Sequence, residues 1–395
     1  PSWHGVPSTA ARKMKSINGA GLVSWRWSLN QLRTLESSVA LTETLRARAS
    51  RHAEVLVRSR PSLPDDYSYL ASVASQLERS FSSFENSAPQ TAVADLDRCL
   101  RTCVGELRDA GLDERLHPIT QSLLSSSFAN LISARVLLWR INQLDGPRPP
   151  PLPSSTDGWN PTDIPATLAA EAISAGVFGE TPFLSDIVLD AVDDMRAFCR
   201  EKFGDVPEVD IRSPQLMPMD PEISATDQTA AKYAAPDCLR DGPVVVPPYV
   251  QFVLHELLKN ALASHIYRVG VERIDELPDI ELRYGIQSGW GQVTILDHGG
   301  GWPAGGAERA VKFMYTTRPG RARGHGEASW QYSRAHGSQL EGLGVGLALS
   351  ELHARFLGGD LALGGLPGQG AHVTFFFDVT GDRTDCSPVL LPMAS

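Results

Sequence analysis

Two polar side chains four residues apart, Glu256 and Asn260, have the chemistry of a metal-assisted reaction. A carboxylate can accept a proton, and carboxylate and carboxamide oxygens are good ligands for a hard cation such as Mg²⁺. Apolar residues recur at helical spacing after the two prolines at 247 and 248, so we expect a helix that starts just after them and carries Glu256 and Asn260 on one face. A solvated helix face often shows the same spacing, so the pair gains meaning only from the motifs that follow it.

Two glycine-rich turns follow this helix. The first, DHGGG at 297–301, ends an alternating, β-branched stretch that predicts a strand over 292–296. The second, EGLGVGL at 341–347, opens a helical run that we place at 348–356. Glycines at such positions let backbone N–H groups and a helix N-terminus approach phosphates closely. Two more strands are predicted at 361–363 and 372–377, joined by a turn rich in glycine.

The order of these motifs resembles the GHKL (Bergerat) nucleotide-binding domain, which gyrase-type ATPases, a class of heat-shock chaperones, sensor histidine kinases and MutL proteins share. More narrowly, four segments are similar to the mitochondrial 2-oxoacid dehydrogenase kinases, a family that includes pyruvate dehydrogenase kinase and branched-chain 2-oxoacid dehydrogenase kinase. They are ELLKNA at 256–261, DHGGG at 297–301, MYTT at 314–317, and GLGVGL at 342–347, which is followed by ARFLGGDL at 354–361. The resemblance is close from about residue 183 to 377 and weaker over the first half.

The resemblance implies phosphoryl transfer from Mg-ATP, with ATP or ADP and Mg²⁺ as cofactors, to a serine of a dehydrogenase E1 component. Asn260 would then bind Mg²⁺, Glu256 would act as the general base, and Lys259 would lie beside them near the nucleotide, although a solvated helix lysine is an equally good reading. Asp297 would accept the adenine amino group. The other implied nucleotide-binding residues are Gly299, Gly301, Thr317, Gly342, Leu343, Gly344, Val345, Gly346 and Leu347. The basic, glycine-rich segment 312–340 stands where this superfamily carries its ATP lid.

Several positions depart from the family pattern. Phe252 stands where these kinases often carry a histidine one turn before the glutamate, and His255 is adjacent to Glu256 instead. One residue along a helix rotates the side chain by about 100°, so we do not expect His255 to hydrogen-bond Glu256. Ala263 replaces an arginine, and Ala371 replaces a threonine that helps to hold adenine, a loss on the order of 1 kcal/mol.

The first half departs further from the family. The helix that lines its small-carboxylate pocket has two arginines four residues apart, and this chain keeps only Arg135, with Leu131 at the earlier place. Regulation by 2-oxoacids is therefore in question.

Composition places the chain among ordinary globular proteins. Its 395 residues are 42% hydrophobic and 21% charged, which suits two domains that each bury a core. No run approaches the roughly 18 apolar residues that a membrane span needs. The net charge of −10 argues against a nucleic-acid partner. The five cysteines show no zinc spacing, and Cys99 and Cys103 lie one helical turn apart, which suits a reducing compartment.

We predict an α+β fold of two domains, an N-terminal antiparallel helical bundle followed by a GHKL α/β sandwich. The predicted segments are a basic arm or transit remnant at 1–28, the bundle at 29–145, a proline-rich linker at 146–162, the nucleotide-binding domain at 163–380 and a tail at 381–395. The arm has no acidic residue before Glu36, as in mitochondrial transit segments, although a plain basic arm looks the same. With the family resemblance, the mitochondrial matrix is the expected location.

Two functions of different classes remain open. The first is an active serine kinase, expected as a homodimer, that acts on a 2-oxoacid dehydrogenase E1 and also contacts the E2 lipoyl domain. The second is a kinase-derived pseudoenzyme that serves as a structural or assembly subunit of another mitochondrial complex. A sensor histidine kinase is a weaker third reading, because His117 precedes a proline and lacks the usual following glutamate.

Overall fold

The computed structural model describes residues 28–59, 68–109, 118–145, 184–212, 243–317 and 344–383. The predicted arm up to residue 27, the linker at 146–162, and most of segment 312–340 lie outside these ranges, as do Gly342 and Leu343. The predicted domain limits therefore remain predictions.

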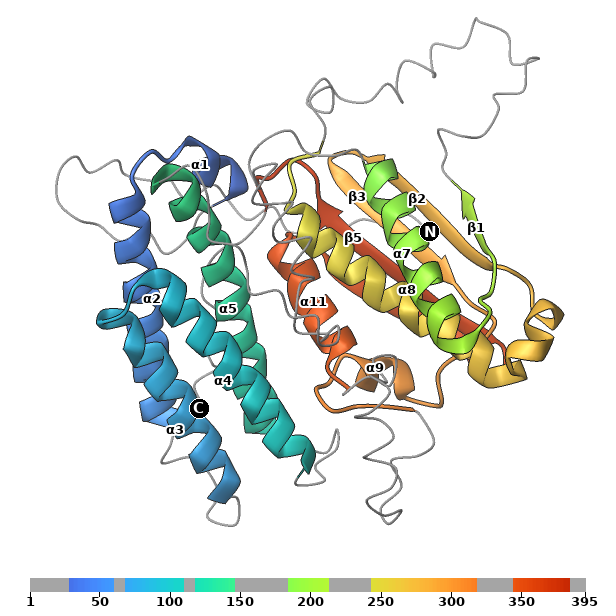
Figure 1. Cartoon of the computed structure of the whole chain (residues 1–395), viewed down its shortest axis with the longest axis horizontal. Helices are drawn as coiled ribbons and strands as arrows, with labels where there is room; N and C mark the ends of the chain where they lie inside the picture. The colour runs from blue at the N-terminus through green and yellow to red at the C-terminus, as the bar shows by residue number, and fades with distance from the viewer. Residues whose placement is uncertain are drawn as a thin grey trace, which may run out of the picture.

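Helices alone form the first part of the chain. They are α1 (Leu29–Thr34), α2 (Ser38–Ser59), α3 (Ser68–Ser82), the 3₁₀ turn η2 (Ser83–Glu85), α4 (Pro89–Asp109) and α5 (Pro118–Asp145). Each of the four long helices packs against at least two others around one apolar core, as Figure 1 shows, and α5 is buried on most of its surface. A helix that is apolar on nearly all sides needs neighbours on more than one side, and α5 finds them in α2, α4 and the rest of the molecule.

Arg135 of α5 does not project alone into this core. It makes an ion pair with Asp97 of α4 (Nη2 to Oδ1, 2.8 Å), and the other oxygen of the same carboxylate binds Arg101. The arginine that the family resemblance assigned to a carboxylate pocket is therefore paired with a carboxylate of this chain.

The second part combines helices with a five-stranded sheet. Its elements are α7 (Leu184–Phe203), β1 (Val209–Arg212), α8 (Pro247–Val269), the 3₁₀ turn η5 (Val271–Glu276), β2 (Ile280–Gln287), β3 (Trp290–Leu296), α9 (Gly306–Ala310), α11 (Gly346–Phe356), β4 (Asp360–Leu366) and β5 (Gly370–Asp378). The strand order is β1-β2-β3-β5-β4, with β1 parallel to β2 and every other pair antiparallel. The α+β class predicted from the sequence is confirmed.

One face of the sheet is covered by helices. Figure 1 shows α7, α8 and α11 in front of the strands, with α8 between the other two. The buried side chains of β5 alternate as a half-buried strand requires, since Val373, Phe375 and Phe377 turn to this core. Gly291 of β3 lies opposite Phe377, and an added Cβ there would be 2.4 Å from the phenylalanine ring. The core of this part therefore lies between the sheet and α8.

Two predicted helix starts were wrong by two residues each. α8 includes Pro247 and Pro248, because proline lacks only an N–H that the first turn of a helix leaves unpaired in any case. α11 begins at Gly346 instead of Ala348, so the last glycine of the second motif is its first helical residue.

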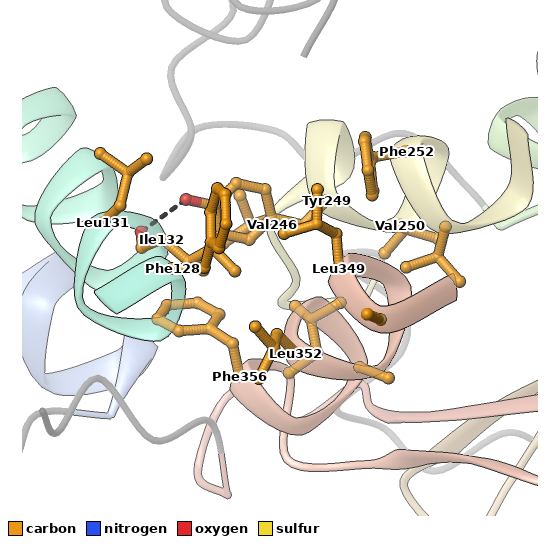
Figure 2. Close-up of a cluster of buried hydrophobic side chains, with 14 of the residues drawn as sticks. Phe128, Leu131, Ile132, Val246, Tyr249, Val250, Phe252, Leu349, Leu352 and Phe356 are labelled. Carbon is orange, nitrogen blue, oxygen red and sulfur yellow. Dashed lines mark hydrogen bonds between the residues drawn. The ribbon is translucent and has the colours of Figure 1, made fainter. Parts of the chain in front are cut away.

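The two parts meet along α5. Figure 2 shows Phe128 and Ile132 of α5 facing apolar side chains of α8 and α11, with a hydrogen bond from the Tyr249 hydroxyl to the Ile132 carbonyl (2.6 Å). This contact buries the start of α8 against the helical part. Among the described helices, none is both long and apolar enough to cross a membrane.

Candidate active site

α8 carries Glu256 and Lys259 as a buried ion pair. Both side chains are almost fully buried, and the Lys259 ammonium donates to Oε1 of Glu256 from one helical turn away. A buried carboxylate is stable only when it is paired or hydrogen-bonded, and Lys259 supplies that partner. The structure thus places the two predicted catalytic residues in direct contact, and Lys259 is not a solvated surface lysine.

The other oxygen of Glu256 lies at the N-terminus of α11. A Cβ added to Gly346 would be 2.0 Å from Oε2 of Glu256, so only glycine leaves room for the carboxylate here. Free N–H groups at a helix N-terminus attract anions. A carboxylate and a helix end that could bind an anion therefore lie side by side.

His255 faces away from this pair, as the helical rotation predicted. Its Nε2 lies 3.3 Å from the carboxylate of Asp194 on α7. Phe252, at the place where the family often has histidine, instead packs against the ring of His353 on α11, with ring centroids 4.5 Å apart. At the position where the family often has histidine, this chain therefore has apolar packing between α8 and α11.

The first glycine motif is attached to the other end of α8. Gly299 packs so closely on Ser264 that an added Cβ would be 2.0 Å from the serine Oγ. The backbone N–H of His298 donates to Nε2 of His265 (2.7 Å), and Arg268 donates to the carbonyl of His298. Three residues within the last two turns of α8 therefore hold this glycine turn.

Asp297 is oriented by backbone groups. Its Oδ1 accepts hydrogen bonds from the N–H groups of Gly299 (2.8 Å) and Ala371 (3.3 Å). Burial raises the pKa of the Asp297 carboxyl, while these hydrogen bonds and one from Ser264 lower it. Ala371 thus contributes through its backbone, and Ser264 adds a hydroxyl beside Asp297 although Ala371 offers none.

Asn260 lies between the two glycine motifs. Glu256, Asn260 and Ser264 follow one another at four-residue steps and therefore share one face of α8, with the outer two in contact with the second and the first motif. Asn260 is half-buried, and its carboxamide makes no hydrogen bond within the described part of the chain. Its oxygen is thus available to a ligand held between the motifs.

The donor set fits Mg²⁺ carried by a nucleotide. Magnesium usually keeps several waters and binds one or two protein oxygens together with substrate phosphates, so one Asn260 oxygen suffices. No group of three or more His, Cys, Asp or Glu side chains able to hold a metal occurs among the described residues. The described residues therefore favour an ion that binds together with a nucleotide over an ion held by protein side chains alone.

The second motif rests on the segment that follows α9. Gly344 has φ +72°, and an added Cβ would be 2.6 Å from the carbonyl carbon of Met314. Gly346 and Leu347 begin α11, Val345 is its buried N-cap residue, and Thr317 is exposed at the end of a described range. In the first motif, Gly301 has φ +67°, and a Cβ added there would lie 2.4 Å from the Leu366 carbonyl oxygen.

Sequence reasoning missed Ser264, His265 and Arg268 as residues that build the site. A signal for Ser264 was present, since it continues the four-residue step of Glu256 and Asn260. No local pattern marks His265, whose role depends on a turn 33 residues away.

The part of the chain that builds this site matches a known protein family. Residues 246–381 match the family model of the histidine kinase-, DNA gyrase B-, and HSP90-like ATPases. This span begins at the N-cap residue of α8 and includes both glycine motifs and the strands β2 to β5.

The chain is also similar to several mitochondrial pyruvate dehydrogenase (acetyl-transferring) kinases. It is 28% identical to the kinase of Drosophila melanogaster, in a match that covers 51% of this chain and 43% of the relative. It is 24% identical to human isozyme 3, in a match that covers 67% of this chain and 54% of the relative. A probable kinase of this name from Caenorhabditis elegans is 34% identical, in a match that covers 34% of this chain and 30% of the relative. The matches thus span about half the length of these relatives or less. Over residues 246–381 the chain is therefore similar to the histidine kinase-, DNA gyrase B- and HSP90-like ATPases, and it is also similar to the mitochondrial pyruvate dehydrogenase kinases.

Proposed function

We propose that this protein is a mitochondrial protein-serine kinase that transfers the γ-phosphate of Mg-ATP to the E1 component of a 2-oxoacid dehydrogenase complex. The observation that carries the proposal is the position of Glu256, which has one oxygen on Lys259 and the other at the N-terminus of α11. Phosphoryl transfer needs positioned groups and charge balance more than covalent help from the protein, and this arrangement offers both.

Each side chain has a role in the proposed reaction. Asp297 accepts the adenine amino group, and the backbone of Gly299 and Gly301 leaves room for the base. Asn260 would hold Mg²⁺, which would supply charge neutralisation for the transferring phosphoryl group. The N–H groups at the start of α11 bind phosphate oxygens, and Glu256 accepts the proton of the attacking serine hydroxyl while Lys259 holds its carboxylate in place.

The names of the relatives support the proposed partners and location. They are kinases of the acetyl-transferring pyruvate dehydrogenase and are called mitochondrial. These names support a mitochondrial location and an E1 substrate. From the family resemblance we further propose the matrix as the location, a homodimer, and the E2 lipoyl domain as a docking partner. These kinase names favour an active enzyme over a kinase-derived structural subunit.

A phosphotransfer assay tests the proposal. Wild-type protein is incubated with Mg-ATP labelled at the γ-phosphate and with purified E1 components, next to Asn260→Ala and a matched control, Asn142→Ala, whose side chain accepts a hydrogen bond from Gln90 in the helical part. We expect Mg²⁺-dependent labelling of an E1 serine by wild type and Asn142→Ala. Asn260→Ala should lose about two orders of magnitude or more in rate.

Two results would contradict the proposal at different levels. If wild type binds Mg-ATP but labels no E1, the kinase assignment fails and the structural-subunit alternative leads. If wild type does not bind Mg-ATP at all, the nucleotide-binding roles of Asn260 and Asp297 fail as well.

A further inference from the structure

The backbone at Phe313 to Tyr315 supports the second glycine motif. Phe313 and Met314 are almost fully buried, and the Met314 N–H donates to the Gly344 carbonyl (2.6 Å). Met314 has φ +70°, an uncommon conformation for a residue other than glycine, so surrounding contacts must maintain it. Gly344 lies directly on this backbone, as its close approach to Met314 shows.

Those surrounding contacts come from the helical part of the molecule. The Gln121 carboxamide of α5 binds the Phe313 backbone in both directions: Nε2 donates to the Phe313 carbonyl (2.9 Å), and Oε1 accepts from the Phe313 N–H (2.9 Å). Phe128, two helical turns further along α5, stacks on the Phe313 ring with centroids 5.5 Å apart and planes 12° from parallel. One face of α5 therefore holds both the backbone and the side chain of Phe313.

Two hydrogen bonds from one planar amide fix the orientation of the Phe313 backbone more firmly than apolar packing can. Each bond satisfies a backbone group that would otherwise be unpaired at a buried residue. The contacts then continue without a gap from Gln121 to Phe313, Met314, Gly344 and the start of α11, where Gly346 touches Glu256.

We propose that Gln121 is a positioning residue for nucleotide binding, because it fixes Phe313 and Met314 and so keeps Gly344 and the N-terminus of α11 in place beside Glu256. The inference rests on the proposed function of this site. It adds that α5 and the phosphate-binding backbone are energetically coupled, so a shift of α5 changes nucleotide affinity, and nucleotide binding in turn biases the position of α5.

The test compares Gln121→Met with Gln90→Met in the full chain. Methionine keeps the length of glutamine but makes neither hydrogen bond, and exposed Gln90 loses only a bond to Asn142 within the helical part. We expect Gln121→Met to raise the Kd for Mg-ADP about tenfold and to speed hydrogen exchange at the Met314 amide by a similar factor. Gln90→Met should leave both unchanged. Phe128→Leu, which removes the ring stack, should act in the same direction with a smaller effect and serves as the test if Gln121→Met does not fold.

The two readouts separate this inference from the proposed function. If wild type binds Mg-ADP while Gln121→Met and Gln90→Met show the same Kd and the same Met314 exchange, Gln121 is not a positioning residue and the nucleotide site stands. If wild type binds no Mg-ADP, the proposed function fails, and faster exchange at Met314 in Gln121→Met alone still supports the structural link. A fall in the melting temperature without a change in Kd or exchange would show a merely structural role and overturn the inference.

Discussion

The carboxylate of Glu256 occupies a site shaped by one lysine and one glycine. Lys259 balances its charge in a place from which water is excluded, and Gly346 gives it room beside a helix N-terminus. The position of Glu256 therefore depends on the absence of a side chain at Gly346.

Gly346→Ala is expected to impair nucleotide chemistry without unfolding the protein. The new methyl group would overlap Oε2 of Glu256, and the flexible end of that side chain would move aside. We expect phosphotransfer to E1 to fall at least about tenfold, while the melting temperature changes little. The control is Gly105→Ala in α4, where a Cβ meets no atom within 4 Å; it should raise stability by about 0.5–1 kcal/mol, as Gly to Ala does within a helix. Equal activity of the two variants would rule out this role for Gly346.

At the scale of the element, α8 joins the two glycine motifs. Its N-terminal half reaches the second motif through Glu256, and its C-terminal end reaches the first through Ser264, His265 and Arg268. Because a helix is stiff, the separation of the two motifs is set by the roughly two to three turns between these contacts.

Arg268→Met is expected to loosen the first glycine motif. The guanidinium donates to the carbonyls of His298, Gln369 (2.7 Å) and Gly368 (3.0 Å), and so ties the motif to the turn between β4 and β5. We expect a loss of about 1–3 kcal/mol in the free energy of unfolding by urea, together with weaker nucleotide binding. Arg273→Met is the control, because exposed Arg273 forms only a surface ion pair with Glu276 at 3.5 Å and a bond to a neighbouring carbonyl; its effect should stay within about 0.5 kcal/mol. Similar losses for both variants would contradict the role given to Arg268.

At the scale of the whole molecule, buried histidines occur in the helical part, at the first glycine motif and where the two parts meet. His52 accepts a hydrogen bond on Nδ1 from Asn130, so its neutral form carries the proton on Nε2, toward Ser127. Burial lowers the pKa of His52 to about 4 and of His353 to about 3. Burial and the neighbouring charges of His298 and Arg268 lower the pKa of His265 to about 4.

These pKa values predict that the folded protein loses stability as the pH falls from about 6.5 toward 4. In that window the unfolded chain binds protons that the folded chain does not, so the free energy of unfolding rises with pH. Each of the three histidines adds at most about 1.4 kcal/mol per pH unit. Urea unfolding over this range should show a flatter slope for His52→Gln than for wild type, whereas His372→Gln, at an exposed position on β5, should keep the wild-type slope. An unchanged slope in His52→Gln would show that His52 is protonated in the fold.

The sequence alone determined the features that depend on neighbours along the chain. Helical spacing placed Glu256 and Asn260 on one face, and alternation predicted the strands that became β3, β4 and β5. Strands β1 and β2 appear only in the structure, because the four residues of β1 are too few for a pattern and their parallel pairing joins segments about 70 residues apart.

Only the tertiary structure decided what those features contact. Nothing near Gln121 in the chain indicates that its carboxamide binds Phe313, 192 residues later, and the sequence does not show that Gly346 makes room for Glu256. Spacing along a helix or strand sets the direction of a side chain, whereas the partner it meets depends on how distant segments pack. The sequence therefore indicated where the proposed nucleotide site lies, and the packing of α5, α8 and α11 decided how the helical part is connected to it.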